Sequence, residues 1–503
     1  MRDTLLISIC WGACIIAGAP AIYADDFDDF SKSLELEFDD FKQSGRKEYD
    51  DFRLKANEEM AEFMGRPWEQ RSQRPKIVPP PDPSPEPVII DDDIDNRPLP
   101  NPSPVVIDSV IDVPAPRPQP QPIAPIRDIT APSPVNPITC RMYGTDFTLR
   151  GADLRDYRIN GHSGADFGQA WRYLCGERTN NLLIDCLAER DKRHLCDWAY
   201  LMLLKKAAET AVGGDRHNES ALLTGFLLCQ SGYKMRFAID SQGSLHVFFA
   251  ATGHLYDRAH IVDSGQLFFA LTEPCSAQVE ICSYSYPKEK SLSFAIDRRM
   301  QLAFSPAPAR TVTARFHPEL SASVSVNKNL IDFYNDYPEA TLNDSPYTKW
   351  AIYANTPASD EVVRDLYPAI RKAIEKKSQR DAANMILHLA ETFPYGYDDK
   401  IWGRDRAFFL EETWHYPYSD CEDHAIHFSR MIRDIMDLDV VLVYYPGHLA
   451  SAVAFTDPEI TGDYFIHRGR RFTVCDPTIF YSNIGETMKG MDNSGAVLID
   501  LKR

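Results

Sequence analysis

The stretch SDCEDHA at residues 419–425 decides the fold, because its pattern predicts the start of a buried helix. Ser419 and Glu422 have the S-x-x-E spacing of a capping box, which predicts Ser419 as the N-cap and puts Cys421 in the first helical turn. Apolar residues then recur at spacings of three and four, as on a buried helix face. They are Ala425, Ile426, Phe428, Met431, Ile432 and Ile435. The free N–H groups and positive dipole end of such a helix favour the thiolate form of Cys421.

Two further motifs follow, each at the end of an expected strand. Residues 440–445 (VVLVYY) indicate a buried strand, and a Pro-Gly turn after it makes His448 the start of the next strand. Residues 471–474 (RFTV) indicate another strand, which delivers Asp476 before a proline ends it. The order helix start, strand, strand therefore presents a cysteine, a histidine and an aspartate.

These three residue types are the ones needed to activate a thiol. A thiol at its ordinary pKa is only a few per cent thiolate at neutral pH, so it needs an adjacent base. Cys421 would attack an acyl carbon, and His448 would take its proton and later protonate the leaving group. Asp476 would hold the imidazole in the correct tautomer. The sequence therefore predicts a catalytic triad of Cys421, His448 and Asp476.

Metal binding is the alternative interpretation of the same region. Cys421, His424 and His427 are spaced by three and share a helix face, and His448 or Cys475 would complete a tetrahedral site. No CxxC or HExxH pattern accompanies them. The prediction is therefore that no metal and no cofactor is required. A redox lock between Cys421 and Cys475 is a separate hypothesis, which rests on the adjacency of Cys475 to Asp476.

The motifs carry a resemblance to a known family. Residues 366–498 resemble the transglutaminase-like superfamily of papain-type cysteine enzymes, and in particular its secreted bacterial members. The resemblance rests on DCEDHA at 420–425, on a histidine 27 residues after the cysteine, and on DPT at 476–478. It implies that the three residues named above are the triad. It also implies an α+β fold in which the cysteine helix packs on an antiparallel sheet.

Length, net charge and the N-terminal sequence restrict the number of domains, the kinds of partner and the localisation. A chain of 503 residues with 44% hydrophobic content should form more than one domain. Its net charge of −19 argues against nucleic acid and anionic membrane surfaces as partners. Residues 1–24 have the apolar run and small residues of a signal peptide, although its basic n-region is weak. We expect export to the periplasm or cell surface, and an uncleaved membrane anchor is the alternative.

The residues after the signal fall into a repeat and a linker. Residues 25–70 carry an aromatic motif every 11 residues, which predicts a helix for self-association or docking. The alternative is a helix folded back on its own domain. Residues 71–137 are proline-rich, and residues 75–137 alone hold 20 of the 36 prolines. They predict an extended, semi-rigid spacer, with residues 88–90 and 105–107 as candidates for docking as edge strands.

A possible second copy of the C-terminal pattern lies upstream, in residues 138–340. Aligning its apolar helix with the one after Cys421 puts His217 at the cysteine position and Thr272 at the aspartate position. His246 would be the counterpart of His448 after a small gap. Such a copy lacks the nucleophile, so we expect a structural or substrate-binding role for it and catalysis in residues 341–503.

Two function classes follow from these observations. The first is an exported cysteine enzyme that acts on amide or peptide bonds of a protein or a cell-wall peptide, by hydrolysis rather than transamidation. The second is a non-enzymatic assembly or binding protein with a vestigial domain. Trp402 and Trp414 precede the cysteine and are candidates for walls of the substrate cleft.

Overall fold

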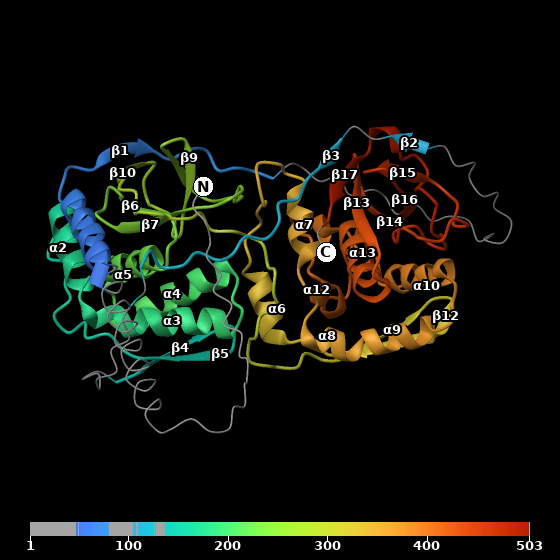
Figure 1. Ribbon diagram of the computed structural model, residues 1–503, viewed down its shortest axis with the longest axis horizontal. Helices are drawn as coiled ribbons and strands as arrows, with labels where there is room; N and C mark the ends of the chain where they lie inside the picture. The colour runs from blue at the N-terminus through green and yellow to red at the C-terminus, as the bar shows by residue number, and fades with distance from the viewer. Residues whose placement is uncertain are drawn as a thin grey trace, which may run out of the picture. The chain divides into compact units, whose positions relative to one another are not determined.

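A computed structural model describes residues 47–48, 50–79, 104–106, 109–124, 126 and 136–501, with the backbone alone described at 104–106 and 399 (Figure 1). The predicted signal peptide, the first two aromatic repeats and residues 88–90 lie outside the described residues. The chain divides into two compact units, residues 1–55 and 56–503, and the elements below belong to the second. No helix of the described ranges is long and apolar enough to cross a membrane.

The C-terminal half contains a seven-stranded sheet that carries the predicted triad region. Its strand order is β2-β15-β16-β14-β13-β17-β3, and the five central strands are all antiparallel. Helix α13 (Cys421–Met431) packs on β13 and β14, as the sequence predicts. The strands are β2 (Pro104–Val106), β3 (Val110–Ile111), β13 (Asp439–Tyr445), β14 (His448–Ala454), β15 (Tyr464–His467), β16 (Arg470–Cys475) and β17 (Val497–Asp500).

The upstream half contains a six-stranded sheet in the order β1-β10-β6-β7-β9-β8. Helix α5 (His217–Gln230) packs on β6 and β7, as α13 does on β13 and β14. All pairings in this sheet are antiparallel. The strands are β1 (Glu69–Ser72), β6 (Met235–Ile239), β7 (Leu245–Ala250), β8 (His260–Asp263), β9 (Gln266–Ala270) and β10 (Gln278–Cys282).

The two halves share one topology. In each, five strands follow the helix and lie in the order fifth, first, second, fourth, third. The helix begins at His217 in the first half and at Cys421 in the second, so these two residues occupy the same place in the two patterns. This is the arrangement that a duplication would produce, and it includes the strand order, which the alignment alone did not predict.

Helices surround the two sheets, so the molecule belongs to the α+β class. Helix α10 (Gln379–Glu391) packs against α13, because one face of it is apolar. Two hairpins, β4 with β5 and β11 with β12, complete the strands. Bounds of the other elements are α2 (Gly164–Leu174), α3 (Asn180–Lys192), α4 (Asp197–Val212), α6 (Lys328–Asn335), α7 (Thr348–Asn355), α8 (Asp360–Asp365), α9 (Tyr367–Ile374), α11 (Asp398–Ile401), α12 (Leu410–His415), β4 (Ile138–Met142), β5 (Thr145–Leu149), β11 (Arg310–Ala314) and β12 (His317–Val324).

The helix predicted for residues 25–70 ends earlier than expected, since β1 already begins at Glu69. From Ala56 onward its apolar side chains are buried in the same core as the upstream half, Met60 and Met64 among them. The ring of Phe63 lies 5.5 Å from that of Tyr284. These residues therefore follow the alternative interpretation, a helix folded back on its own domain.

The expectation of an extended spacer is wrong for the described part of residues 71–137. Strands β2 and β3 pair in parallel with β15 and β17 at the two edges of the C-terminal sheet. Further along, the Gln119 side chain donates to the backbone carbonyl of Leu195 at 2.9 Å and to Asp197 at 3.0 Å. The buried Arg190 donates to the carbonyl of Pro120. Proline-rich backbone lacks N–H donors, but its carbonyls remain available, and here they are used by the domain.

Candidate active site

Helix α13 begins at Cys421, but its N-cap is one residue later than predicted. The Asp420 side chain accepts the backbone N–H of Asp423, and the Asp423 side chain accepts the N–H of Asp420. Ser419 is not the cap, because its hydroxyl contacts a ring nitrogen of His424 at 2.9 Å. The shift follows from the extra acceptor oxygen of a carboxylate, which makes D-x-x-D an equally good reciprocal cap.

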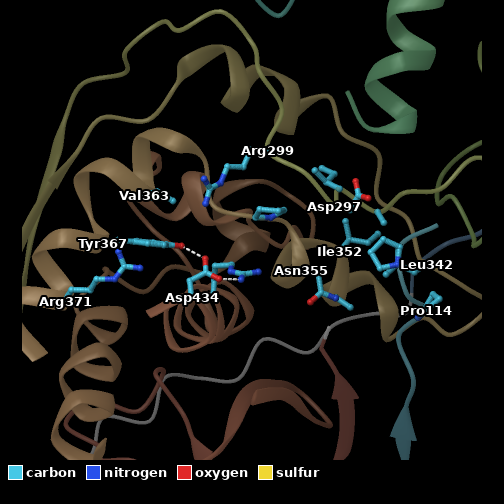
Figure 2. Close-up of a pocket in the computed structure, with 16 residues that line it drawn as sticks. Pro114, Asp297, Arg299, Leu342, Ile352, Asn355, Val363, Tyr367, Arg371 and Asp434 are labelled. Atoms are coloured by element: carbon cyan, nitrogen blue, oxygen red, sulfur yellow. Dashed lines mark hydrogen bonds and ion pairs between the residues drawn. The ribbon is translucent and has the colours of Figure 1, made fainter. Parts of the chain in front are cut away.

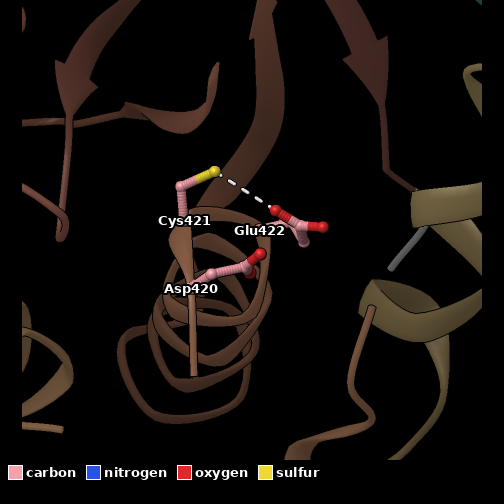
Figure 3. Close-up of side chains that lie close together, drawn as sticks. All are labelled: Asp420, Cys421 and Glu422. Carbon is pink, nitrogen blue, oxygen red and sulfur yellow. Dashed lines mark hydrogen bonds between the residues drawn. The ribbon is translucent and has the colours of Figure 1, made fainter. Parts of the chain in front are cut away.

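The thiol of Cys421 is surrounded by carboxylates rather than by positive charge. Its Sγ donates a hydrogen bond to Glu422 Oε2 at 3.1 Å (Figure 3). The side chain is buried, and burial together with the charges of Glu422 and Asp420 raises the pKa of the Cys421 thiol well above its ordinary value. A backbone hydrogen bond from Leu449 opposes that pKa shift only in part. The expectation that the helix dipole alone favours thiolate is therefore wrong for this arrangement.

His448 and Asp476 form the buried pair that the triad requires. His448 Nε2 lies 2.7 Å from Asp476 Oδ2, and the His448 side chain has no exposed surface. A carboxylate only accepts, so Nε2 carries the hydrogen and Nδ1 is left as an acceptor. That Nδ1 is buried without a hydrogen-bond partner. The backbone N–H of Thr478 donates to Asp476 Oδ1 at 3.0 Å and fixes the carboxylate.

The three residues of the predicted triad thus lie in one region of the fold. The histidine and the aspartate are paired, whereas the thiol is hydrogen-bonded to Glu422. Helix α13, which starts at Cys421, packs on β14, which starts at His448. The thiol proton is held by Glu422, not by the free nitrogen of His448.

Four carboxylates form a buried cluster beside the thiol, and sequence reasoning missed it. Asp398, Asp405, Asp420 and Glu422 each offer an oxygen within 4.8 Å of the others. Asp420 Oδ1 and Glu422 Oε1 are buried without a hydrogen-bond partner. The Lys349 ammonium lies 3.0 Å from Asp405 and brings a positive charge to this cluster. Acidic residues on both sides of Cys421 were the only local signal.

The chemistry of this donor set suits a hard divalent cation. Ca²⁺ takes six to eight oxygen ligands, mostly carboxylates and carbonyls, in flexible geometry. Burial, and then the neighbouring carboxylates, raise the pKa of Asp420, and burial raises the pKa of Glu422, so the charged forms of both groups would be favoured by additional positive charge. Asp398, Asp405, Asp420 and Glu422 would hold the ion, which would supply that charge. The donor set would suit such an ion, and the absence of a metal requirement stays a prediction.

The two tryptophans do not share the role expected of them. Trp414, on α12, is buried in the core, and its indole N–H donates to His427 Nε2 at 3.2 Å. Trp414 therefore packs against α13 inside the core and does not form a wall of a cleft. Trp402 is partly exposed and lies edge-on to Tyr416 with ring centroids 4.8 Å apart.

The alternative metal site on the histidine face of α13 is not assembled. His424 contacts Ser419 and the carbonyl of Pro477, while His427 faces Trp414. Cys475 is a buried thiol whose Sγ points to a backbone carbonyl two residues away, and it forms no disulfide with Cys421. Within the described residues, both the tetrahedral site and the redox lock are therefore absent.

The stability of the C-terminal half should fall in acid through His427. Burial lowers the pKa of His427 to about 3, from an ordinary 6.5, so as the pH falls the unfolded chain takes up the proton first. This contribution to stability is complete above pH 6.5 and is lost on the way down. At pH 5 the loss should reach about 2 kcal/mol. Denaturant unfolding at pH 8 and pH 5 measures it.

The matched control for that experiment is His427→Phe. This variant loses the acceptor for Trp414, so it should be less stable than the wild type at pH 8. Its pH dependence should nevertheless be flatter than that of the wild type by the same 2 kcal/mol, roughly. If the free energy of unfolding fell by the same amount from pH 8 to pH 5 in both proteins, His427 would not be the group responsible.

The upstream half has a degenerate version of the site. His246 contacts Thr272 Oγ1 through Nδ1 and Asp240 Oδ2 through Nε2, both at 3.0 Å. The contact between His246 and Thr272 is the one that the sequence alignment implies, whereas Asp240 was not foreseen. His217, at the start of α5, lines the same cavity of about 490 Å³. No thiol lies among the residues that line this cavity, so the nucleophile is missing.

Comparison with known proteins gives no further guide to the site. No family model, no curated protein and no solved structure matches this chain.

Proposed function

We propose that residues 341–503 are a cysteine enzyme that acts on amide or peptide bonds through an acyl-enzyme. The observation that carries the proposal is the buried His448–Asp476 pair, whose remaining ring nitrogen has no partner and which lies on the strand under the cysteine helix. A buried polar atom without a partner is uncommon and often marks a functional site. The helix on an antiparallel sheet is compatible with the transglutaminase-like, papain-type core that the motifs resemble.

The reaction would follow from these groups. His448 Nδ1 takes the thiol proton, and the Cys421 sulfur attacks the carbonyl carbon of the amide. The backbone N–H of Cys421, at the free end of α13, is a donor for the oxyanion. The imidazolium then protonates the leaving amine, which departs and leaves a thioester. Water, deprotonated by His448, attacks the thioester and yields a carboxylic acid and the free thiol.

The substrate class we propose is a polypeptide or cell-wall peptide, with hydrolysis as the outcome. Transfer to an amine would require that water be kept from the thioester. Export of the chain remains part of this proposal, because the predicted signal lies outside the described residues. The upstream half, which has the topology without the thiol, would serve as a structural or substrate-binding domain.

Mass spectrometry of products tests the proposal directly. Purified full-length protein is incubated with a peptide library and with cell-wall fragments, in parallel with Cys421→Ser. Hydrolysis should add the mass of water across one bond, and a trapped acyl-enzyme should appear on Cys421 alone. An amine added in excess reports transfer through a different product mass. Products that persist in Cys421→Ser would rule out the thiol as nucleophile.

The second function class, a non-enzymatic assembly protein, predicts a different result. It has support from the closed state of the thiol, which is buried and bonded to Glu422. In that case Cys421 should react with iodoacetamide no faster than an exposed, unactivated thiol. Cys275 is an exposed cysteine of the same chain and provides the internal reference.

A further inference from the structure

A second cavity, of about 430 Å³, lies beside the C-terminal part of α13, and Cys421 does not line it (Figure 2). Its two sides differ in character. Leu342, Ile352 and Pro114 lie on one side together with the carboxylate of Asp297, whereas Arg299, Arg371, Tyr367 and Asp434 lie on the other. The size falls within the range of small-molecule sites, which are mostly apolar with a few convergent polar groups.

Three guanidinium groups line the polar side, and the carboxylate of Asp434 pairs with only one of them. Asp434 pairs with Arg430 and also accepts the hydroxyl hydrogen of Tyr367. Arg430 Nε is nevertheless buried without an acceptor. Arg371 lies over the Tyr367 ring at 5.6 Å, and no ion pair to it occurs in the described part of the chain. Positive groups therefore outnumber the acceptors that reach them from inside the cavity.

The charges of these groups are close enough to affect one another. The charge of Arg299 contributes to lowering the pKa of the half-buried Arg430, after burial itself. Arg299 has a partner, Asp360, but the pair is 3.2 Å apart and exposed on both sides. Exposed pairs of this kind hold their partners weakly. An anion in the cavity would relieve this repulsion and supply the missing acceptors.

The backbone at this place is also irregular. Asp434 lies in a π-helical turn, Ile432–Met436, which continues α13 directly. Such turns are rare inside helices and often occur at functional sites. Asp434 forms an ion pair with Arg430, which lies four residues earlier on the same side of the helix.

We propose that this cavity binds a small organic anion, a phosphate or carboxylate group carried on an apolar body. The anionic group would lie between Arg299, Arg371 and Arg430, and the apolar body would extend toward Leu342 and Ile352. Arginine suits this task because its planar fork matches phosphate and carboxylate oxygens. The proposal does not depend on catalysis at Cys421, since the two places share no lining residue.

Calorimetric titration with phenyl phosphate and, separately, benzoate tests the site in the full-length protein. We expect at least one of them to bind with a dissociation constant on the order of 1 mM or below, given ligands of this size. The double variant Arg299→Gln/Arg371→Gln should weaken that binding about tenfold or more. Arg364→Gln removes an exposed arginine whose partner is Asp365, outside the cavity lining, and should bind as the wild type does.

Two further titrations decide what is recognised. Benzyl alcohol has the ring without the charge and inorganic phosphate has the charge without the ring, so each should bind more weakly than phenyl phosphate. Absence of binding by both aryl anions would overturn the proposal, as would equal affinity in the double variant. Unchanged thermal unfolding of the double variant, whose two arginines are largely exposed, shows that lost binding does not come from lost folding.

Discussion

Replacing His448 by alanine should lower the turnover of any peptide that the wild type cleaves by about 10³-fold or more. The buried imidazole of His448 is the base proposed for the thiol proton, because its Nδ1 has no hydrogen-bond partner and it begins the strand on which the cysteine helix packs. Without it, burial and the neighbouring carboxylates keep the Cys421 thiol protonated. Steady-state rates with the peptide found by mass spectrometry give the ratio, and iodoacetamide labelling of Cys421 gives an independent measure.

His427→Phe is the matched control, because it removes another buried histidine that faces Trp414 and not the thiol. It should keep turnover within a few-fold of the wild type at neutral pH. Asp476→Asn refines the assignment. An amide oxygen still accepts from His448 Nε2, so this change should cost less than Asp476→Ala, which leaves the ring unpositioned. Similar rates for His448→Ala and wild type would contradict the proposed mechanism.

The local parts of the site were predictable, because they depend on patterns within a few residues. The helix that begins at Cys421, the strand that begins at His448 and the strand that ends before Asp476 all follow from apolar periodicity and turn residues. The helix and the two strands are therefore where the sequence predicts them. The capping residue differs by one position, since Ser419 and Asp420 both satisfy the chemistry of an N-cap.

The parts that failed depend on contacts far apart in the chain. Asp398 and Asp405 approach Asp420 only in the folded structure, so no spacing rule could reveal the cluster. The expectation of a thiolate at a helix N-terminus considered the dipole and ignored these charges. The proline-rich segment was expected to be a spacer because its composition predicts the conformation of an isolated chain. Composition does not reveal contacts with the folded domain, such as the hydrogen bond from Arg190 to the carbonyl of Pro120.

A comparison of the two halves indicates what the carboxylate cluster beside Cys421 does. Both have a helix, a histidine and the same sheet order, yet the helix begins at a cysteine beside a carboxylate cluster in the C-terminal half and at His217 in the upstream half. Carboxylates so close to a nucleophile work against thiolate formation, and burying them together is costly. The cluster therefore costs stability and suppresses thiolate formation at Cys421. We expect this suppression to be reversible.

Adding millimolar Ca²⁺ to protein freed of metal should therefore make Cys421 more reactive. Neutralising the carboxylates would remove the largest charge contribution to the raised pKa of the thiol and the acceptor that holds its proton. A decrease of one unit in that pKa would raise the alkylation rate near pH 7 about tenfold. Iodoacetamide labelling followed by mass spectrometry of the Cys421 peptide measures the rate, and the midpoint of thermal unfolding should rise with Ca²⁺.

Two variants distinguish the effect of the carboxylate charges on the thiol from the effect of bound Ca²⁺. Asp420→Asn/Glu422→Gln removes two negative charges and two of the four ligands, so its thiol should react faster than that of the metal-free wild type yet ignore added Ca²⁺. Asp332→Asn, an exposed aspartate paired with Lys328, should behave as the wild type does. Mg²⁺ should act more weakly, because it requires a tighter octahedral shell. If Ca²⁺ changed neither alkylation nor unfolding, the cluster would be a structural feature held by Lys349, and the thiol would need another route to activation.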